Sequence, residues 1–190
     1  MARKQIAIES QGGFTLIELL IASLLTVLVL FVAGGLLISV MKTITTVTTN
    51  NGLTNWAQLA AGSFESGIRN SSDSLLTNPT GNDQLLVARV ASRGATISWS
   101  CAAWYYAASA NTLYYTISST AIPAAPTTAQ LATWTVLDST VKPTSGTSIF
   151  SDSGGQVILS FTSSAGSNPT AAITTSAFSR AGSTGTLACQ

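Results

Sequence analysis

The chain has 190 residues, a formal net charge of +1 and only 8% charged residues, against about 25% in ordinary soluble domains. It contains no histidine, which excludes His-based acid–base catalysis, Ser-His-Asp triads and most zinc sites. No P-loop or Rossmann glycine pattern occurs, and the acidic residues do not match a recognised calcium loop. We therefore expect no enzyme, no cofactor and no metal site. The composition favours a protein displayed outside the cytoplasm.

The N-terminal part combines a short basic stretch with a long apolar run. Arg3 and Lys4 precede the apolar segment 14–40, and no charged residue lies between Glu18 and Lys42. Such a run is long enough to cross a bilayer as a helix, and the positive-inside rule leaves the basic end in the cytoplasm. A charge at the bilayer centre costs about 2.5–3.5 kcal/mol, so Glu18 is expected to have a partner.

The sequence Gly12-Gly13-Phe14-Thr15-Leu16-Ile17-Glu18 resembles the class III signal of type IV prepilins and type II secretion pseudopilins. The resemblance covers about the first 30 residues and implies that 1–13 is a leader. It implies cleavage between Gly13 and Phe14 by a prepilin peptidase, which then methylates the Phe14 amine. An ordinary secretory signal cleaved near Ala33, Gly34 and Gly35 is the alternative, but its apolar region is about 7–15 residues long. The mature chain would carry six basic and six acidic side chains, so nucleic-acid binding is not indicated.

Glu18 matches the fifth mature residue of the family, and a filament core would surround it with apolar helices. We expect its carboxylate to pair with the Phe14 ammonium of a neighbouring subunit and to set the axial register. The alternative is that Glu18 reaches the lipid headgroups. The hydroxyls of Thr15, Ser23 and Thr26 are expected to bond back to the preceding helical turn.

Two glycines, Gly34 and Gly35, interrupt the apolar run. Each costs roughly 0.8–1 kcal/mol against Ala in a helix. They predict either a weak point that unwinds during assembly or a site of close helix packing. An amphipathic continuation is expected over 41–71, with a break near Asn51 as an alternative to one unbroken helix.

The segment 72–190 predicts a β-rich head. Strands are expected over 85–90, 96–106, 112–118, 134–137, 157–161 and 171–180. Turn-rich or proline-containing segments predict loops over 76–82, 122–130 and, for the most part, 142–155. We expect one antiparallel sheet that covers the helix with one face.

Two cysteines, Cys101 and Cys189, are not in a CxxC pair, and an exported head favours a disulfide between them. Two buried free thiols are the alternative. Six aromatic residues gather on the proposed 96–118 hairpin and predict either core packing and cross-strand pairs or an exposed adhesive surface: Trp99, Trp104, Tyr105, Tyr106, Tyr114 and Tyr115.

Together these features predict an α+β fold with the lollipop arrangement of type IV pilins. The function that the resemblance implies is a structural subunit of a pilus-like filament. Its partners would be other pilins and the prepilin peptidase/methyltransferase, and it would move from the cytoplasmic membrane to the cell surface. The alternatives are a type II secretion pseudopilin, a tip adhesin or DNA-uptake module using Arg89, Arg93 and Arg180, and an anchored surface protein that never polymerises.

Overall fold

The computed structural model describes residues 13, 15–92, 97–164, 171–179 and 189. The chain divides into two compact units, and the boundary between Thr45 and Thr46 lies inside the long helix α1. Each unit is described by itself below.

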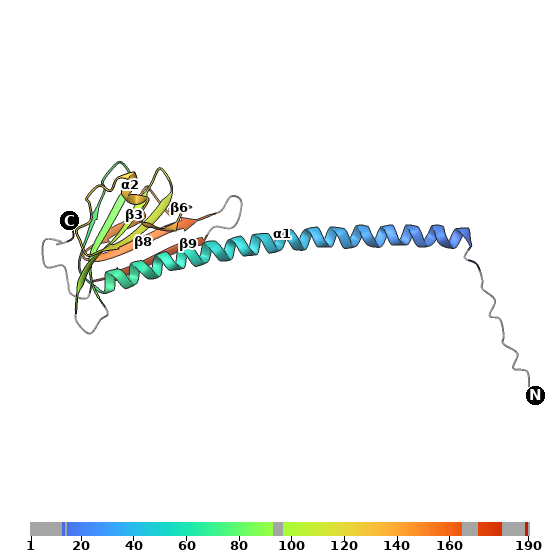
Figure 1. Ribbon diagram of the computed structural model, residues 1–190, viewed down its shortest axis with the longest axis horizontal. Helices are drawn as coiled ribbons and strands as arrows, with labels where there is room; N and C mark the ends of the chain where they lie inside the picture. Colours follow the sequence, from blue (N-terminus) through green and yellow to red (C-terminus); the bar gives the residue numbers. More distant parts are fainter. Residues whose placement is uncertain (1–12, 14, 93–96, 165–170, 180–188, 190) are drawn as a thin grey trace, which may run out of the picture. The chain divides into compact units, whose positions relative to one another are not determined.

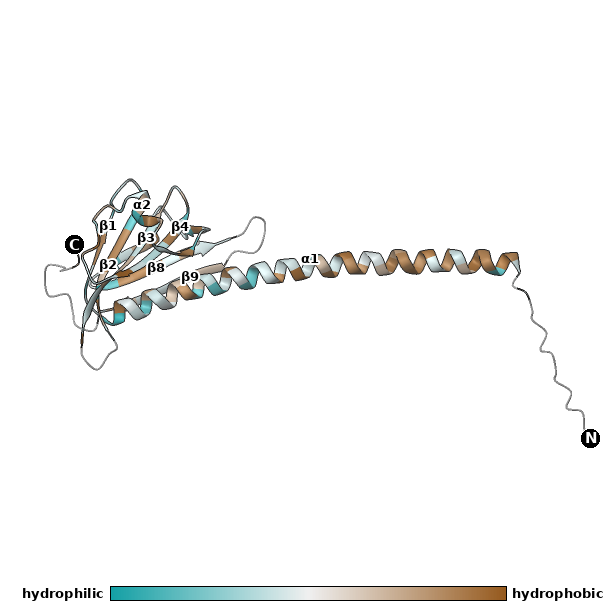
Figure 2. Cartoon of the chain, viewed as in Figure 1, coloured by the Kyte–Doolittle hydropathy of each residue, from teal (hydrophilic) through white to brown (hydrophobic). Residues whose placement is uncertain are grey.

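Helix α1 extends without interruption from Leu16 to Arg69 (Figure 1). The continuous helix is confirmed, since the alternative break near Asn51 is absent and the helix also continues through Gly34 and Gly35. The part of α1 in the first unit is mostly apolar, as the largely brown ribbon in Figure 2 shows. The sequence placed the helix end at about residue 71, two residues beyond the observed end.

The second unit contains two antiparallel sheets. The first has the order β1-β2-β3-β4-β5, a meander in which each strand pairs with the next in sequence. Its strands are β1 Ser71–Thr77, β2 Gln84–Ala91, β3 Trp99–Ala107, β4 Thr112–Ser118 and β5 Thr135–Asp138. The second sheet has the order β6-β8-β7, and β9 also pairs with β8. Its strands are β6 Val141–Pro143, β7 Phe150–Ser153, β8 Gln156–Ser163 and β9 Ala171–Phe178.

The α+β class, the long N-terminal helix and the antiparallel sheet are confirmed, but three loop predictions were wrong in part. Strand β1 occupies the first residues of the expected loop 76–82 and begins directly after α1. The short helix α2, Thr128–Leu131, lies in and just beyond 122–130. Strand β6 overlaps the start of the segment 142–155, and β7 lies inside it. These short polar strands form because β2 and β8 offer paired edges, a tertiary effect that local propensity does not contain.

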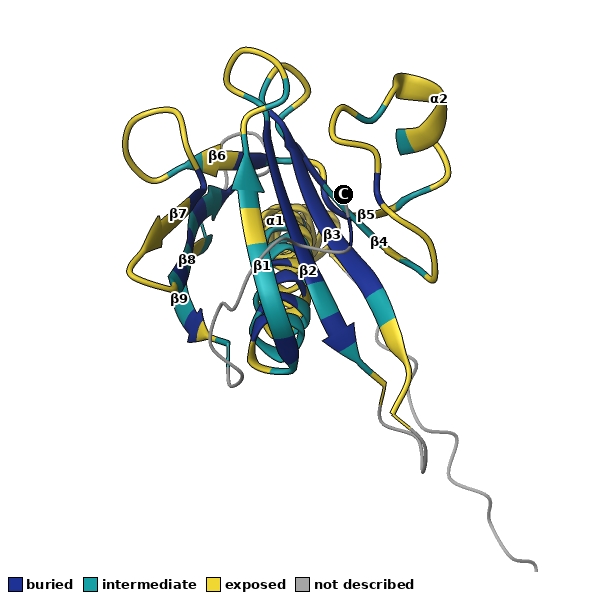
Figure 3. Cartoon of the chain, turned by 90° about the vertical axis from the view of Figure 1, so that its left-hand side faces the viewer, coloured by how far each residue is buried: buried dark blue, intermediate teal, exposed yellow. Residues whose placement is uncertain are grey.

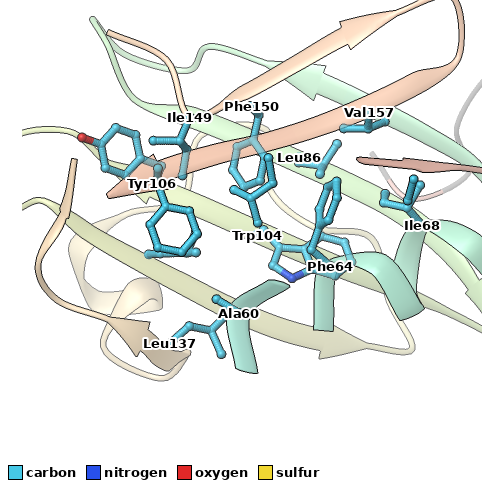
Figure 4. Packing of buried hydrophobic residues seen from close by; sticks show 14 of the residues in the cluster. Ala60, Phe64, Ile68, Leu86, Trp104, Tyr106, Leu137, Ile149, Phe150 and Val157 are labelled. Atoms are coloured by element: carbon cyan, nitrogen blue, oxygen red, sulfur yellow. The ribbon is translucent and has the colours of Figure 1, made fainter. Parts of the chain in front are cut away.

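The main core lies between α1 and the inner faces of the sheets. Figure 4 shows Phe64 of α1 beside Trp104 and Phe150, with Ala60 nearer to Leu137 and Ile68 nearer to Val157. The Phe64 ring stacks on Phe150 and meets Trp104 edge-on, with both centroid distances at 6.2 Å. These side chains are fully buried or nearly so, and apolar burial of this kind is the main stabilising term in the fold.

The outer face of the first sheet is also buried, which corrects the expectation of one solvent-facing side. Strands β2 and β3 appear dark blue along most of their length in Figure 3. A second apolar cluster covers this face, and Ile122 and Cys189 from the later chain belong to it. The backbone N–H of Ile122 donates to the Cys189 carbonyl at 2.8 Å. Because both faces are covered, β2 and β3 are near-continuous apolar runs rather than alternating ones.

Two buried or half-buried polar side chains hold the sheets and turns in place. The Gln84 Oε1 accepts from the backbone N–H groups of Ile149 and Phe150 at 2.6 and 2.9 Å, and its Nε2 donates to the Phe150 carbonyl at 2.9 Å. Gln84 therefore joins the start of β2 to the start of β7. Asp83 accepts from the Tyr105 hydroxyl at 2.6 Å and from the Ala108 N–H at 2.8 Å, which fixes the turn after β3.

Candidate functional site

The start of α1 is closed by a reciprocal pair of hydrogen bonds between Thr15 and Glu18. The Glu18 N–H donates to Thr15 Oγ1 at 3.3 Å, and the Thr15 N–H donates to Glu18 Oε2 at 3.0 Å. This is a capping box, in which the N-cap threonine and the glutamate three residues later satisfy each other's free backbone N–H groups. The expectation that Thr15 bonds back to a preceding turn was therefore wrong, whereas Ser23 and Thr26 do so, at 2.8 and 2.7 Å.

The capping box uses only one oxygen of the Glu18 carboxylate. Oε2 accepts both from the Thr15 N–H and from the Thr15 hydroxyl, each at 3.0 Å. Within the described part of the chain Oε1 accepts no hydrogen bond. One oxygen thus fixes the start of the helix while the other is available to a partner outside the chain. Gly13 is exposed, and Phe14, the expected new N-terminus, lies outside the described residues.

The helix that follows Glu18 is a candidate membrane span by length and composition. Its most apolar 18-residue window has a mean hydropathy of 2.8, and none of that window is buried by the rest of the protein. Leu16 and Phe31 are 85% and 84% exposed. So large an apolar surface requires lipid or protein around it, which is consistent with membrane anchoring.

The predicted weak point of the helix has no steric role inside the chain. A Cβ atom built on Gly34 or Gly35 would meet no other atom within 4 Å. Nothing in the single chain therefore requires glycine at these two positions, and both sequence interpretations, local unwinding and close helix packing, stay predictions. Gly67, near the end of α1, differs because the Trp104 ring fills the space above it.

The predicted disulfide is present. Cys101 and Cys189 are bonded across a sequence separation of 88 residues, with a Cα–Cα distance of 5.5 Å. Both cysteines are buried in the second apolar cluster. The bond therefore attaches the C-terminal end of the chain to the outer face of β3.

The aromatic cluster is mostly core. Trp104, Tyr105 and Tyr106 are at most 5% exposed, and burial raises the pKa of both tyrosines, with the Asp83 hydrogen bond adding to the effect for Tyr105. Tyr115 packs against Trp104 with a centroid distance of 5.5 Å. Trp99 differs, since it is 42% exposed and lies beneath the Arg89 guanidinium at 4.7 Å.

Arg93 and Arg180, the other two arginines considered for nucleic-acid contact, lie outside the described residues. Among the described side chains no three His, Cys, Asp or Glu residues gather in one place. Comparison with protein-family models, with curated proteins and with solved structures finds no match to this chain.

Proposed function

We propose that this protein is a structural subunit of a type IV pilus-like filament, stored in the cytoplasmic membrane and assembled through α1. The observation that carries the proposal is a carboxylate, with one oxygen that has no partner among the described residues, at the start of an exposed apolar stretch of helix that has no other charge before Lys42. A membrane anchor alone has no need of that charge, because each charge in the apolar region costs free energy. In a filament of packed helices, the charge of Glu18 can fix the axial register between neighbouring subunits.

The assembly step begins with removal of residues 1–13, by the resemblance of the leader to prepilin signals. Cleavage before Phe14 creates a new ammonium four residues from Glu18. In a bundle of such helices, this ammonium of one subunit meets the unused Glu18 oxygen of the next. The pair neutralises two charges in an apolar core, and breaking such a pair by removing one partner costs about 3–5 kcal/mol. A subunit whose helix is out of register would leave both charges unpaired, so that cost disfavours its incorporation.

The head remains outside the membrane and forms the surface of the filament. Its described residues have few charges and many hydroxyls, and its disulfide suits an oxidising compartment. A pilus and a secretion pseudopilus share this packing. Deletion of the gene distinguishes them: a pilin deletion removes surface fibres, whereas a pseudopilin deletion blocks release of secreted proteins.

The first experiment is to determine the mass and N-terminal sequence of the protein in sheared surface filaments. We expect a chain that begins at N-methylated Phe14. A chain that begins near Gly34 or Gly35 would instead show ordinary secretion, and the role of Glu18 would be wrong. A protein that is processed in membranes but absent from the sheared fraction would favour the pseudopilin.

The charge of Glu18 is tested by Glu18→Gln, with Glu18→Ala beside it. Glutamine at this position still accepts from the Thr15 N–H, since capping boxes accept Glu or Gln, so Glu18→Gln removes the charge and keeps the cap. We expect Glu18→Gln to be inserted in the membrane at the wild-type level and to be lost from filaments as severely as Glu18→Ala. Normal incorporation of Glu18→Gln would show that only the cap matters.

A further inference from the structure

A groove of about 440 Å³ lies between α1 and β5, the last strand of the first sheet. Two apolar side chains of α1, Leu53 and Trp56, line one side, and the chain from Val136 to Thr140 lines the other. Trp56 and Val136 are 52% and 45% exposed. Clefts of this volume hold small ligands in many proteins, and the proposed function makes no use of this one.

Asp138 is the one charged residue among the described residues that line the groove. It is only 6% exposed. Its Oδ1 accepts from the Thr140 N–H at 2.8 Å and from the Thr140 hydroxyl at 2.9 Å. Its Oδ2 is buried and has no hydrogen-bond partner within the described part of the chain. A buried acceptor without a donor is costly, and more so when it is charged, so a donor from outside the chain would stabilise this site.

The carboxylate is held in its orientation by a short chain of hydroxyl groups. The Thr140 hydroxyl donates its only hydrogen to Asp138, so the Ser163 hydroxyl, whose oxygen lies 2.7 Å from that of Thr140, must donate to Thr140. Ser163 is fully buried at the end of β8. Both donors of Thr140 are therefore fixed on Oδ1, and Oδ2 keeps its capacity to accept.

These features select a primary ammonium on a short aliphatic stem. One open oxygen matches the single-point donor of an ammonium better than a guanidinium, which pairs with both oxygens of a carboxylate. A quaternary ammonium has the charge but no N–H to donate. The face of the Trp56 indole attracts a cation, and Leu53 and Val136 suit methylene groups. Because Oδ2 is covered, the groove side chains must move aside for the ammonium to reach it.

We propose that the groove binds a small primary amine, whose ammonium donates to Asp138 Oδ2 while its aliphatic stem lies against Trp56. The site does not depend on the proposed function, because it needs only one copy of the chain and does not involve Glu18. The chemistry predicts that a primary ammonium binds more tightly than a quaternary ammonium or a neutral alcohol of the same length.

The probe is n-butylammonium chloride, added to the full chain in a nonionic detergent. The indole N–H resonance of Trp56, identified as the one missing in Trp56→Phe, reports on the groove. That of Trp99, identified in the same way, is the control, because Trp99 is 42% exposed outside the groove. We expect a saturable shift of the Trp56 resonance alone. Tetramethylammonium and n-butanol should each bind roughly tenfold more weakly or worse, because each lacks the charged N–H donor.

Two variants test the residues of the site. Asp138→Asn keeps the side-chain shape and removes the charge, and it should weaken butylammonium binding roughly tenfold or more. Ser139→Lys, at an exposed position of the groove lining, places an ammonium of the chain itself there and should block the site. Ser151→Lys, at an exposed position of β7, adds the same charge elsewhere and should leave binding unchanged. Wild-type indole resonances before the amine is added show that each variant is folded.

The inference is overturned if the Trp56 resonance shows no saturable shift, if butylammonium binds no better than the two comparison compounds, or if Asp138→Asn binds it as the wild type does. Nα-acetyl-lysine amide provides one more test. If it binds roughly tenfold more tightly than butylammonium, a difference as large as that expected from a charged hydrogen bond, the groove belongs to a lysine of a partner protein and the proposal is wrong. None of these results bears on the filament, which is tested by Glu18→Gln.

Discussion

The packing of Gly67 against Trp104 gives a sharp test of the head structure. A Cβ atom at position 67 would lie 2.3 Å from Trp104 Cη2 and 2.7 Å from Cζ2, well inside normal contact distance. The indole has little freedom to move, because it is fully buried and its Nε1–H donates to Ser63 Oγ at 3.1 Å. The rings of Phe64 and Tyr115 lie against it.

The expected change in the free energy of unfolding follows from two opposing terms. Alanine is favoured over glycine by about 0.8–1 kcal/mol in a helix interior, whereas overpacking a core costs typically 1–3 kcal/mol. Because the overlap with a fixed ring is so large, we expect the overpacking cost to lie near the upper end of its range, about 3 kcal/mol. After the helix-propensity gain is subtracted, Gly67→Ala should lower the free energy of unfolding by about 2 kcal/mol. Gly62→Ala, on the same helix with no atom within 4 Å, should instead gain up to about 1 kcal/mol.

The assay is urea unfolding of the full chain in detergent, followed by tryptophan fluorescence. The same substitution five positions apart should move the midpoint in opposite directions, and the two variants should differ by about 3 kcal/mol. Equal stabilities for Gly67→Ala and Gly62→Ala would refute the packing of Trp104 on the glycine. A stabilised Gly67→Ala would also show that the indole is free to move.

Two further predictions concern the head. Replacing Cys101 and Cys189 together with alanine should lower the free energy of unfolding by about 4–5 kcal/mol, the chain-entropy value for a separation of 88 residues. The loss is measured as a lower urea midpoint, and adding reductant to the double variant should not lower that midpoint further. Burial, helped by the Asp83 hydrogen bond, raises the pKa of Tyr105 above its ordinary value. The contribution of Tyr105 to the free energy of unfolding should therefore be fully present below about pH 10. It should decrease at higher pH, because the tyrosine of the unfolded chain ionises first. Tyr105→Phe should reduce that decrease in stability between about pH 10 and 11, measured by urea unfolding at each pH. A variant with the same pH profile as the wild type would contradict a buried Tyr105 hydroxyl bonded to Asp83.

The long helix and the main strands could be predicted because their signals are local. An uncharged run from Leu19 to Met41 leaves few alternatives to an apolar helix, and β2, β3 and β8 are apolar or alternating with ordinary strand lengths. The pairing of Cys101 with Cys189 could be predicted because the chain has two cysteines in a head that was expected to be exported. These features do not depend on what the rest of the chain does.

The missed elements depend on contacts that are distant in sequence. Strand β1 begins with Ser71, whose hydroxyl donates to the Ile68 carbonyl, and the chain is held there because the Ala91 N–H donates to the Asn70 carbonyl. Strand β7 is held by Gln84, more than 60 positions earlier in the chain. A lone glutamine beside an apolar strand has no pattern that identifies its partners, so neither strand could be read from its own residues.

The capping box is a different case, because its signal was present in the sequence. Thr15 and Glu18 have the Thr-x-x-Glu spacing that begins many helices, but the membrane position of Glu18 drew attention to its charge alone. In the structure Oε2 closes the helix, and Oε1 has no hydrogen-bond partner among the described residues. The cap also survives removal of residues 1–13, since the Thr15 N–H lies after the proposed cleavage.

The proposed contact between copies uses Glu18, a carboxylate that is bonded through only one of its oxygens within the described part of the chain. By contrast, Asp83 has a partner within the chain for each of its oxygens. A chain with so few charges cannot select neighbours by broad electrostatic fields, so in the proposed filament a single carboxylate in apolar surroundings would provide the specificity. Glu18→Gln should therefore disturb the register of the helices while insertion in the membrane is unchanged.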